Sequence, residues 1–192
     1  SETRFVIGFE DEGSGTYEGT AIIGNVAGTT ITLGTSYKFD NTRTSYIDIA
    51  PLSDSKFVVA WYRNNDTTGY AVVLGVTGAD TIGWLSTGEM NFGSGEVDNI
   101  SVAALTSTKF ILAYEDLDST TNFGYMYMAE IDGTDTIQFK TQHVFNAEEG
   151  IDFVHVEKMS EKMFLLAFND DADNSSTRLK VCEVDDFHDI LV

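Results

Sequence analysis

Four acidic loops recur along the chain, and they hold the residues best suited to bind a metal ion. The third loop contains Asp116 and Asp118, and the fourth contains Asp171 and Asp173. Calcium takes about six to eight hard oxygen ligands, and carboxylates two residues apart supply part of such a set. Neither loop has the full Asp-x-Asp-x-Asp-Gly spacing of a dedicated calcium loop. Calcium is therefore the one cofactor that the sequence suggests, and a solvated acidic loop is the simpler interpretation.

The other reactive side chains do not form a pattern that is typical of an enzyme. The histidines at 143, 155 and 188 have no second histidine at metal-ligand spacing, and His155 falls in an alternating apolar stretch that predicts a structural role. No serine lies in a nucleophile elbow, and no glycine-rich phosphate loop precedes a lysine. Paired carboxylates are frequent simply because 31 residues are acidic. We expect a protein that is not an enzyme.

Some residue types could instead carry an attached glycan or bind a carbohydrate ligand. Asn65, Asn99 and Asn174 begin Asn-x-Ser/Thr sequons, which are acceptors for glycosylation. Trp84 and Tyr62 are candidates for an aromatic platform under a sugar ring, with packing in the core as the alternative for the aromatic residues. These positions are hypotheses for a glycan partner.

Composition excludes several classes of partner. The chain has 192 residues, with 31 acidic against 11 basic residues and a net charge of −20. Such a surface repels phosphate, so nucleic acids and anionic membranes are poor partners. The longest apolar runs, such as Phe57–Tyr62, are far too short to insert across a bilayer. The single cysteine, Cys182, cannot form a disulfide within the chain.

An internal repeat of about 50 residues organises the whole chain. Its clearest element reads aromatic, aliphatic, aliphatic, small, aromatic, and its leading phenylalanines at 5, 57, 110 and 164 are 52, 53 and 54 residues apart. An alternating stretch precedes this element, and a glycine- or aspartate-containing turn follows it. The recurring small residue suits a place where neighbouring sheets approach closely. It is found at Gly8, Ala60, Ala113 and Ala167.

The repeat predicts four short antiparallel strands per unit, and no stretch has useful helical periodicity. The apolar strand that begins at each leading phenylalanine is expected to be buried on both faces. Repeated four-stranded units of this length are the signature of propeller blades. We predict an all-β, β-propeller-like single repeat domain over 1–192, with units of approximately 1–45, 46–98, 99–150 and 151–192, of which the first and last are incomplete.

Three segments carry a resemblance to a known type of repeat. They are Ser101-Val102-Ala103, Lys109–Tyr114 and Gly28–Gly34. The unit resembles a propeller-type repeat found in tandem in large secreted, surface and phage structural proteins. This resemblance implies a propeller fold and an extracellular or surface-exposed location, and it carries over no catalytic residue. The fourth unit departs most, with His155 and Met163 at framework positions.

The C-terminal residues fit two registers. In the gap-free alignment, Asp189-Ile190 belongs to the last strand of the fourth unit. In the alternative, Phe187–Ile190 supplies the missing first strand of unit one and closes a four-bladed ring. The first register is preferred, because the second deletes a whole strand. It leaves bare strand edges, which we expect other copies of the chain or further repeats of the same polypeptide to cover.

Two classes of function fit these observations. The first is a non-catalytic extracellular structural or adhesive propeller repeat module, as part of a self-assembling filament, sheath, surface layer or virion appendage. The alternative is a carbohydrate-binding propeller, or the propeller part of a carbohydrate-active enzyme, with glycans as partners. The first is favoured by the repeat, the acidity and the lack of a catalytic pattern.

Overall fold

The protein is built almost entirely from β-strands. The computed structural model describes residues 3–86, 88–117, 122–146, 150–170, 176–186 and 189–191. The elements in chain order are β1 (Arg4–Asp11), η1 (Glu12–Ser14), β2 (Glu18–Ala27), β3 (Thr30–Leu33), β4 (Tyr37–Pro51), β5 (Lys56–Arg63), β6 (Thr68–Val76), β7 (Ile82–Trp84), β8 (Met90–Ser94), β9 (Val97–Ala104), β10 (Lys109–Asp116), β11 (Phe123–Ile131), β12 (Ile137–Asn146), β13 (Ile151–Lys158), β14 (Met163–Asp170), β15 (Ser176–Val184) and β16 (Ile190–Leu191). Over these ranges no helix is long and apolar enough to cross a membrane.

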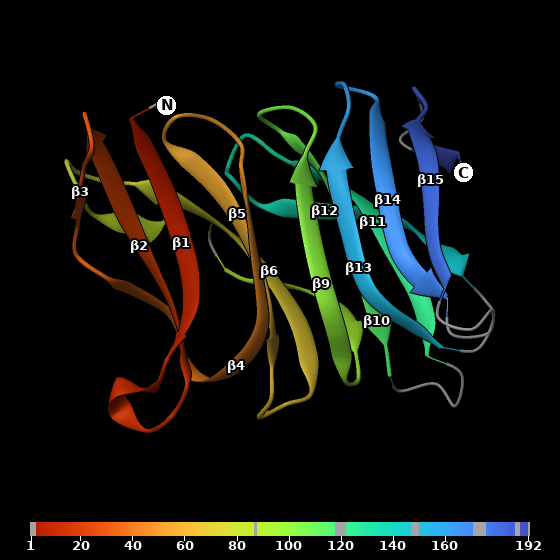
Figure 1. Ribbon diagram of the computed structural model, residues 1–192, viewed down its shortest axis with the longest axis horizontal. Helices are drawn as coiled ribbons and strands as arrows, with labels where there is room; N and C mark the ends of the chain where they lie inside the picture. Colours follow the sequence, from red (N-terminus) through yellow and green to blue (C-terminus); the bar gives the residue numbers. More distant parts are fainter. Residues whose placement is uncertain are drawn as a thin grey trace.

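These strands form four antiparallel sheets that follow one another along the long axis of the molecule (Figure 1). The first sheet holds β1, β2, β3 and the beginning of β4. The second holds the end of β4 with β5, β6, β7 and β8. The third is β9 to β12 and the fourth is β13 to β16. The predicted all-β, propeller-like fold with four repeated units is therefore confirmed.

The strand order within each sheet follows the repeat. β1, β5, β10 and β14 are the equivalent strands that begin at the leading phenylalanines. Ile190 pairs with Val184 as Ile137 pairs with Ile131, which places β16 in the last strand of the fourth sheet and confirms the gap-free register. β1 pairs with β2, and among the described residues no strand covers its other edge.

Three hydrophobic cores lie between successive sheets. β5 and β10 are buried on both faces, as predicted, because each has a sheet on either side. β1 and β14 differ from this prediction, since each lies in a terminal sheet and has one uncovered face. The small residue at Gly8 meets the predicted need for close approach, because a Cβ built there would lie 2.6 Å from Cδ1 of Ile49 in the second sheet.

A β-bulge recurs in the innermost strands, and the sequence pattern did not predict it. The register shifts at one equivalent place in β4, β9 and β13. At this place Tyr46, Asn99 and Phe153 have φ of +53°, +49° and +53°. All three lie eleven residues before the leading phenylalanine of their unit. A bulge increases local twist and re-aims the following side chains.

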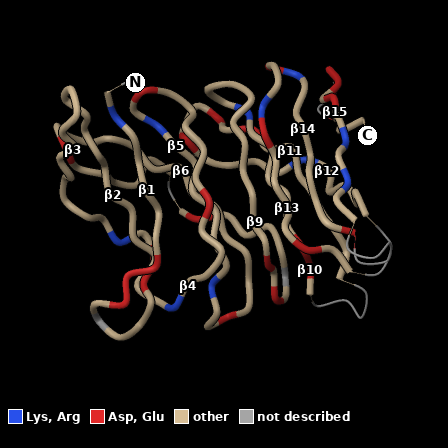
Figure 2. The backbone as a smooth tube through the Cα atoms, in the orientation of Figure 1, with Lys and Arg blue, Asp and Glu red and all other residues tan. Residues whose placement is uncertain are grey.

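A partly buried ion-pair network lies where β4 crosses from the first sheet to the second. Arg63 donates two parallel hydrogen bonds to Glu89, at 2.7 and 2.6 Å, and a third to Oδ2 of Asp40 at 2.6 Å. The indole N–H of Trp61 donates to the same carboxylate oxygen at 2.8 Å. Many other acidic residues fall in loops at the ends of the strands, such as the loop after β1 (Figure 2).

Candidate functional site

A groove runs along the innermost strands β4, β9 and β13, where these three strands of successive sheets meet. Its volume is about 380 Å³, which falls in the range of small-molecule sites. Polar side chains on its walls come from Asp48, His155, Glu157 and Lys158, and the remaining wall is mainly aliphatic. The groove brings polar groups of the second and fourth repeats together beside aliphatic residues of the third, so its chemistry bears on what the array could bind.

Asp48, Ser101 and His155 occupy equivalent positions in three successive repeats. Each lies nine residues before the leading phenylalanine of its unit, and each follows the bulge of its innermost strand. The repeat therefore brings an acid, a hydroxyl and an imidazole into one row across three sheets. The equal spacing of these residues from the leading phenylalanines indicates the row, but the apolar pattern that defines the repeat does not include them.

The acid and the hydroxyl of this row are hydrogen-bonded to the next sheet. Oδ2 of Asp48 accepts a hydrogen bond from the backbone N–H of Val102 at 2.7 Å. Oγ of Ser101 accepts one from the backbone N–H of Val156 at 3.1 Å. Val102 and Val156 are themselves equivalent, so the same type of hydrogen bond joins the second sheet to the third and the third sheet to the fourth. We call this contact, in which a side-chain oxygen accepts a backbone N–H of the next sheet, the inter-sheet lock.

Burial raises the pKa of the Asp48 carboxyl above its usual value. Hydrogen bonds from the N–H groups of Val102 and Ile49, from the hydroxyl of Ser101, and the charge of His155 act in the opposite direction without cancelling the effect of burial. The carboxyl is thus held in an environment that disfavours its charge while both of its oxygens accept backbone N–H groups, Oδ1 from Ile49 at 2.9 Å.

The three residue types are those of a hydrolytic triad, but their order in space is not. In such triads the imidazole lies between the acid and the serine and takes the serine proton. Here Ser101 lies in the middle, with Oγ 3.4 Å from Nδ1 of His155, and the serine is only 2% exposed. Its oxygen already accepts the N–H of Val156. The row is therefore suited to holding sheets together rather than to nucleophilic attack.

The third member of the row faces solvent. The His155 side chain is well exposed, and its Nε2 lies 3.9 Å from Oε2 of Glu157 on the same strand. Lys158 completes the polar part of this wall. Of the other histidines, His143 accepts the backbone N–H of Ile190 at 3.3 Å, and His188 lies outside the described residues.

The predicted calcium ligands are mostly beyond the described ranges. Asp116 is the last residue of β10 and is half-buried. Asp118, Asp171 and Asp173 lie outside the described residues. Over the part of the chain that the structure describes, no three histidine, cysteine or acidic side chains come together as a metal site would require. Calcium binding stays a prediction.

The predicted glycosylation and sugar-platform residues fall in different environments. Asn65 is exposed in the turn between β5 and β6, and Asn174 lies outside the described residues. Asn99 is half-buried, and its Nδ2 donates to Oε2 of the buried Glu115 at 2.7 Å, so a glycan there would displace this bond. Tyr62 is buried between the second and third sheets and is a core residue rather than a platform. Trp84 is half-buried against the core between the first and second sheets.

Comparisons with known proteins support the fold and go no further. No protein-family model matches the chain. No curated protein matches it either. Among solved structures it is similar to the NanB sialidase from Streptococcus pneumoniae, with a TM-score of 0.57, 14% sequence identity, 92% of this chain covered and 27% of the sialidase chain covered. The chain thus spans about a quarter of the length of that enzyme, and the likeness supports a β-propeller-like arrangement of sheets.

Proposed function

We propose that the chain is a non-catalytic structural or adhesive β-propeller repeat module. The observation that carries this proposal is the use of Asp48 and Ser101 as locks between sheets. In a propeller-like array the inner strands surround the central channel, where converging polar groups could serve a ligand. Here those groups are hydrogen-bonded to the backbone of the next repeat, at 2.7 and 3.1 Å, and so they stabilise the array itself.

The proposed setting is extracellular or surface-exposed. It rests on the resemblance to tandem repeats of secreted, surface and phage structural proteins, and on a net charge of −20, which keeps a repeated surface soluble. The module is proposed to work as part of a filament, sheath, surface layer or virion appendage. Such a part contributes shape and connection points to its assembly.

Carbohydrate binding is the second candidate, and the groove favours it. Its volume of about 380 Å³ and the exposed side chains of His155, Glu157 and Lys158 could accept a small polar ligand. On this alternative the bound molecule would contact the fourth sheet, because Asp48 and Ser101 are already committed to other hydrogen bonds.

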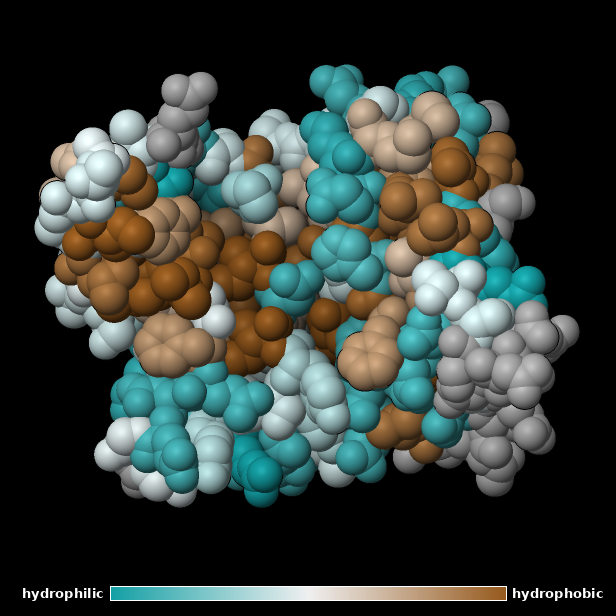
Figure 3. All heavy atoms as spheres, in the orientation of Figure 1, coloured by the Kyte–Doolittle hydropathy of each residue, from teal (hydrophilic) through white to brown (hydrophobic). Residues whose placement is uncertain are grey.

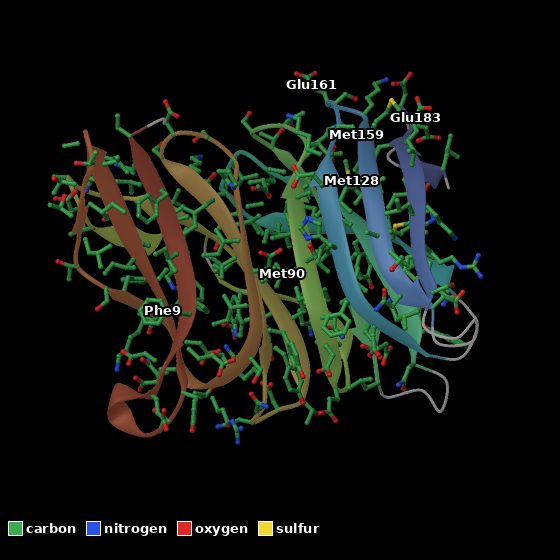
Figure 4. The ribbon with its side chains drawn as sticks, in the orientation of Figure 1. Phe9, Met90, Met128, Met159, Glu161 and Glu183 are labelled. Carbon is green, nitrogen blue, oxygen red and sulfur yellow. The ribbon has the colours of Figure 1, made fainter. Side chains whose placement is uncertain are left out.

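A glycan array with the wild-type chain separates the two candidates. The structural proposal predicts no specific glycan signal and no release of a fluorophore from a panel of aryl glycosides. A specific signal that His155→Ala removes and Glu161→Ala retains would favour carbohydrate binding instead. Glu161 is a suitable control because it is exposed in the loop between β13 and β14 (Figure 4) and is not among the residues that line the groove.

A further inference from the structure

The first sheet leaves an apolar surface uncovered at one end of the array. Ile7 on β1 and Ile31 and Leu33 on β3 form this N-terminal face, and the last two are 59% and 60% exposed. Ile31 pairs with Val26 as Ile82 pairs with Val76 in the second sheet, where Ile82 is buried against the first sheet. The N-terminal face is therefore equivalent to the surface that each later sheet buries against the sheet before it.

The fourth sheet leaves the opposite kind of surface uncovered at the other end. Leu165 on β14 with Leu179 and Val181 on β15 form this C-terminal face, and Leu179 and Val181 are 66% and 53% exposed. The equivalents of these three residues in the third sheet are all fully buried beneath the fourth sheet. They are Ile111, Met126 and Met128.

The register of the strands establishes this equivalence. Leu179 lies opposite Ala167, as Met126 lies opposite Ala113, and so both share a face with the recurring small residue. Directly opposed residues in an antiparallel pair project from the same side of the sheet. The C-terminal face is thus equivalent to the surface by which each earlier sheet packs against the sheet after it.

The two faces are the two halves of one interface that the chain already makes three times. In each internal core, a surface equivalent to the C-terminal face packs against a surface equivalent to the N-terminal face. For example, Met126 and Met128 of the third sheet share a core with Phe164, Leu166 and Phe168 of the fourth. Figure 3 shows hydrophobic side chains gathered over β1 and β2 on one side of the molecule and over β14 and β15 on the other.

The C-terminal face also has the anatomy of a protein–protein interface. The apolar centre of the C-terminal face is bordered by Thr177 and Glu183 on β15 and by His155 and Glu157 on β13. Interfaces typically surround an apolar centre with a polar rim, and contiguous exposed apolar patches on soluble proteins commonly mark interaction sites. Figure 4 labels Phe9 on β1 and Glu183 at the top of β15, which belong to the two opposite terminal sheets.

We propose that the N-terminal face of one copy docks on the C-terminal face of a second copy, head to tail. The second copy is the occupant because the docked pair would continue the interface that joins the internal sheets. A head-to-tail contact closes into a ring if its rotation allows and otherwise grows into a filament. Since propellers close at about four to eight blades, a ring of four-sheet copies would hold two of them. This inference deepens the proposed structural role and rests on it.

Paired charge substitutions test the proposal, because each face can be disabled separately. Ile31→Glu with Leu33→Glu disables the N-terminal face, and Leu179→Glu with Val181→Glu disables the C-terminal face. All four side chains are exposed in the single chain, so the variants are expected to fold, which circular dichroism would verify. Val144→Glu is the control, since Val144 is an exposed apolar residue on β12 of an internal sheet.

The measurement is the solution mass by sedimentation at about 100 µM protein, a concentration that detects weak association. Salt of about 0.5 M screens the repulsion between copies that each carry a charge of −20. We expect the wild type and the Val144→Glu control to form species of two or more copies, and each paired variant alone to stay at 21.1 kDa. An equimolar mixture of the two paired variants should form a dimer, because each retains the face that the other lacks.

Three results would overturn the docking proposal. They are a monomeric wild type under these conditions, a mixture of the two paired variants that fails to associate, and association that only one of the two pairs affects, which would indicate a symmetric contact. These outcomes leave the non-catalytic role untouched. Specific glycan binding by an assembled wild type would instead favour the carbohydrate-binding candidate over the structural role and leave the docking proposal standing.

Discussion

The carboxylate of Asp48 accepts the backbone N–H of Val102 at 2.7 Å and so ties the second sheet to the third. One repeat later, Ser101 ties the third sheet to the fourth by accepting the N–H of Val156. The apolar packing between the sheets is by itself non-directional. The two hydrogen bonds are directional, and they therefore fix how far each innermost strand can slide against the next.

Removing the lock at Ser101 should destabilise the array. Ser101→Ala leaves the buried N–H of Val156 without its partner, at a cost of about 1–3 kcal/mol in the free energy of unfolding. Ser55→Ala, at an exposed position in a loop, is the control and should change stability by less than about 0.5 kcal/mol. Urea denaturation followed by tryptophan fluorescence gives both values. Equal effects of the two substitutions would show that the lock contributes nothing measurable.

The titration of Asp48 should leave a signature in the pH dependence of stability. Burial raises the pKa of Asp48 in the folded chain above the usual 3.8, so the folded state binds the proton more tightly than the unfolded state does. The stability linked to this proton is fully present below the unfolded value and is lost as the pH rises through the folded value. Asp48→Asn has no such titration.

The measurement is therefore a difference between two proteins. The free energy of unfolding of the wild type minus that of Asp48→Asn should fall as the pH rises from about 3 to about 5.5, below the range in which histidine titrates. Taking the difference removes the contributions of the other acidic residues, which both proteins share. A difference that rises with pH would mean that hydrogen bonding outweighs burial at this carboxyl.

The close approach of neighbouring sheets can be tested at one repeated position in two environments. Ala113 is fully buried beneath the fourth sheet, so Ala113→Leu should overpack the interface and cost about 1–3 kcal/mol. Ala167 is its equivalent on the uncovered C-terminal face, where Ala167→Leu has room and should cost much less. Thermal melts at low protein concentration compare the two single chains. Similar losses in both variants would mean that the fourth sheet does not cover Ala113 closely.

The strands and the repeat were predictable because apolar periodicity records burial directly. Phe57 and Phe110 begin strands that are buried on both faces, as their apolar runs indicated. The same pattern overstated burial at Ile7, because the sequence of one unit does not show whether a neighbouring unit covers it. Burial of a terminal face depends on partners beyond the strand itself.

The polar contacts were much less predictable, since they depend on how sheets stack in three dimensions. Nothing in the local pattern around Asp48 indicates that its partner is Val102, 54 residues further along the chain. Likewise, Arg63 of β5 meets Asp40 because β4 begins in the first sheet and ends beside β5 in the second. An alignment of the polar positions of the repeat would still have drawn attention to the row of Asp48, Ser101 and His155.

The bulge in β13 gives the last prediction. Phe153 has φ of +53° and is 72% exposed. Its backbone is therefore strained in a left-handed conformation, while its ring is not buried in the single chain. Phe153→Gly removes that strain, and the expected gain in the free energy of unfolding is about 1 kcal/mol. Glu157→Gly is the matched control, because Glu157 is exposed on the same strand but is not among the residues with positive φ. There glycine should cost about 0.5–1 kcal/mol. Chemical denaturation at low protein concentration measures both variants, and a loss of stability at Phe153 equal to that at Glu157 would contradict the assignment of strain to the bulge.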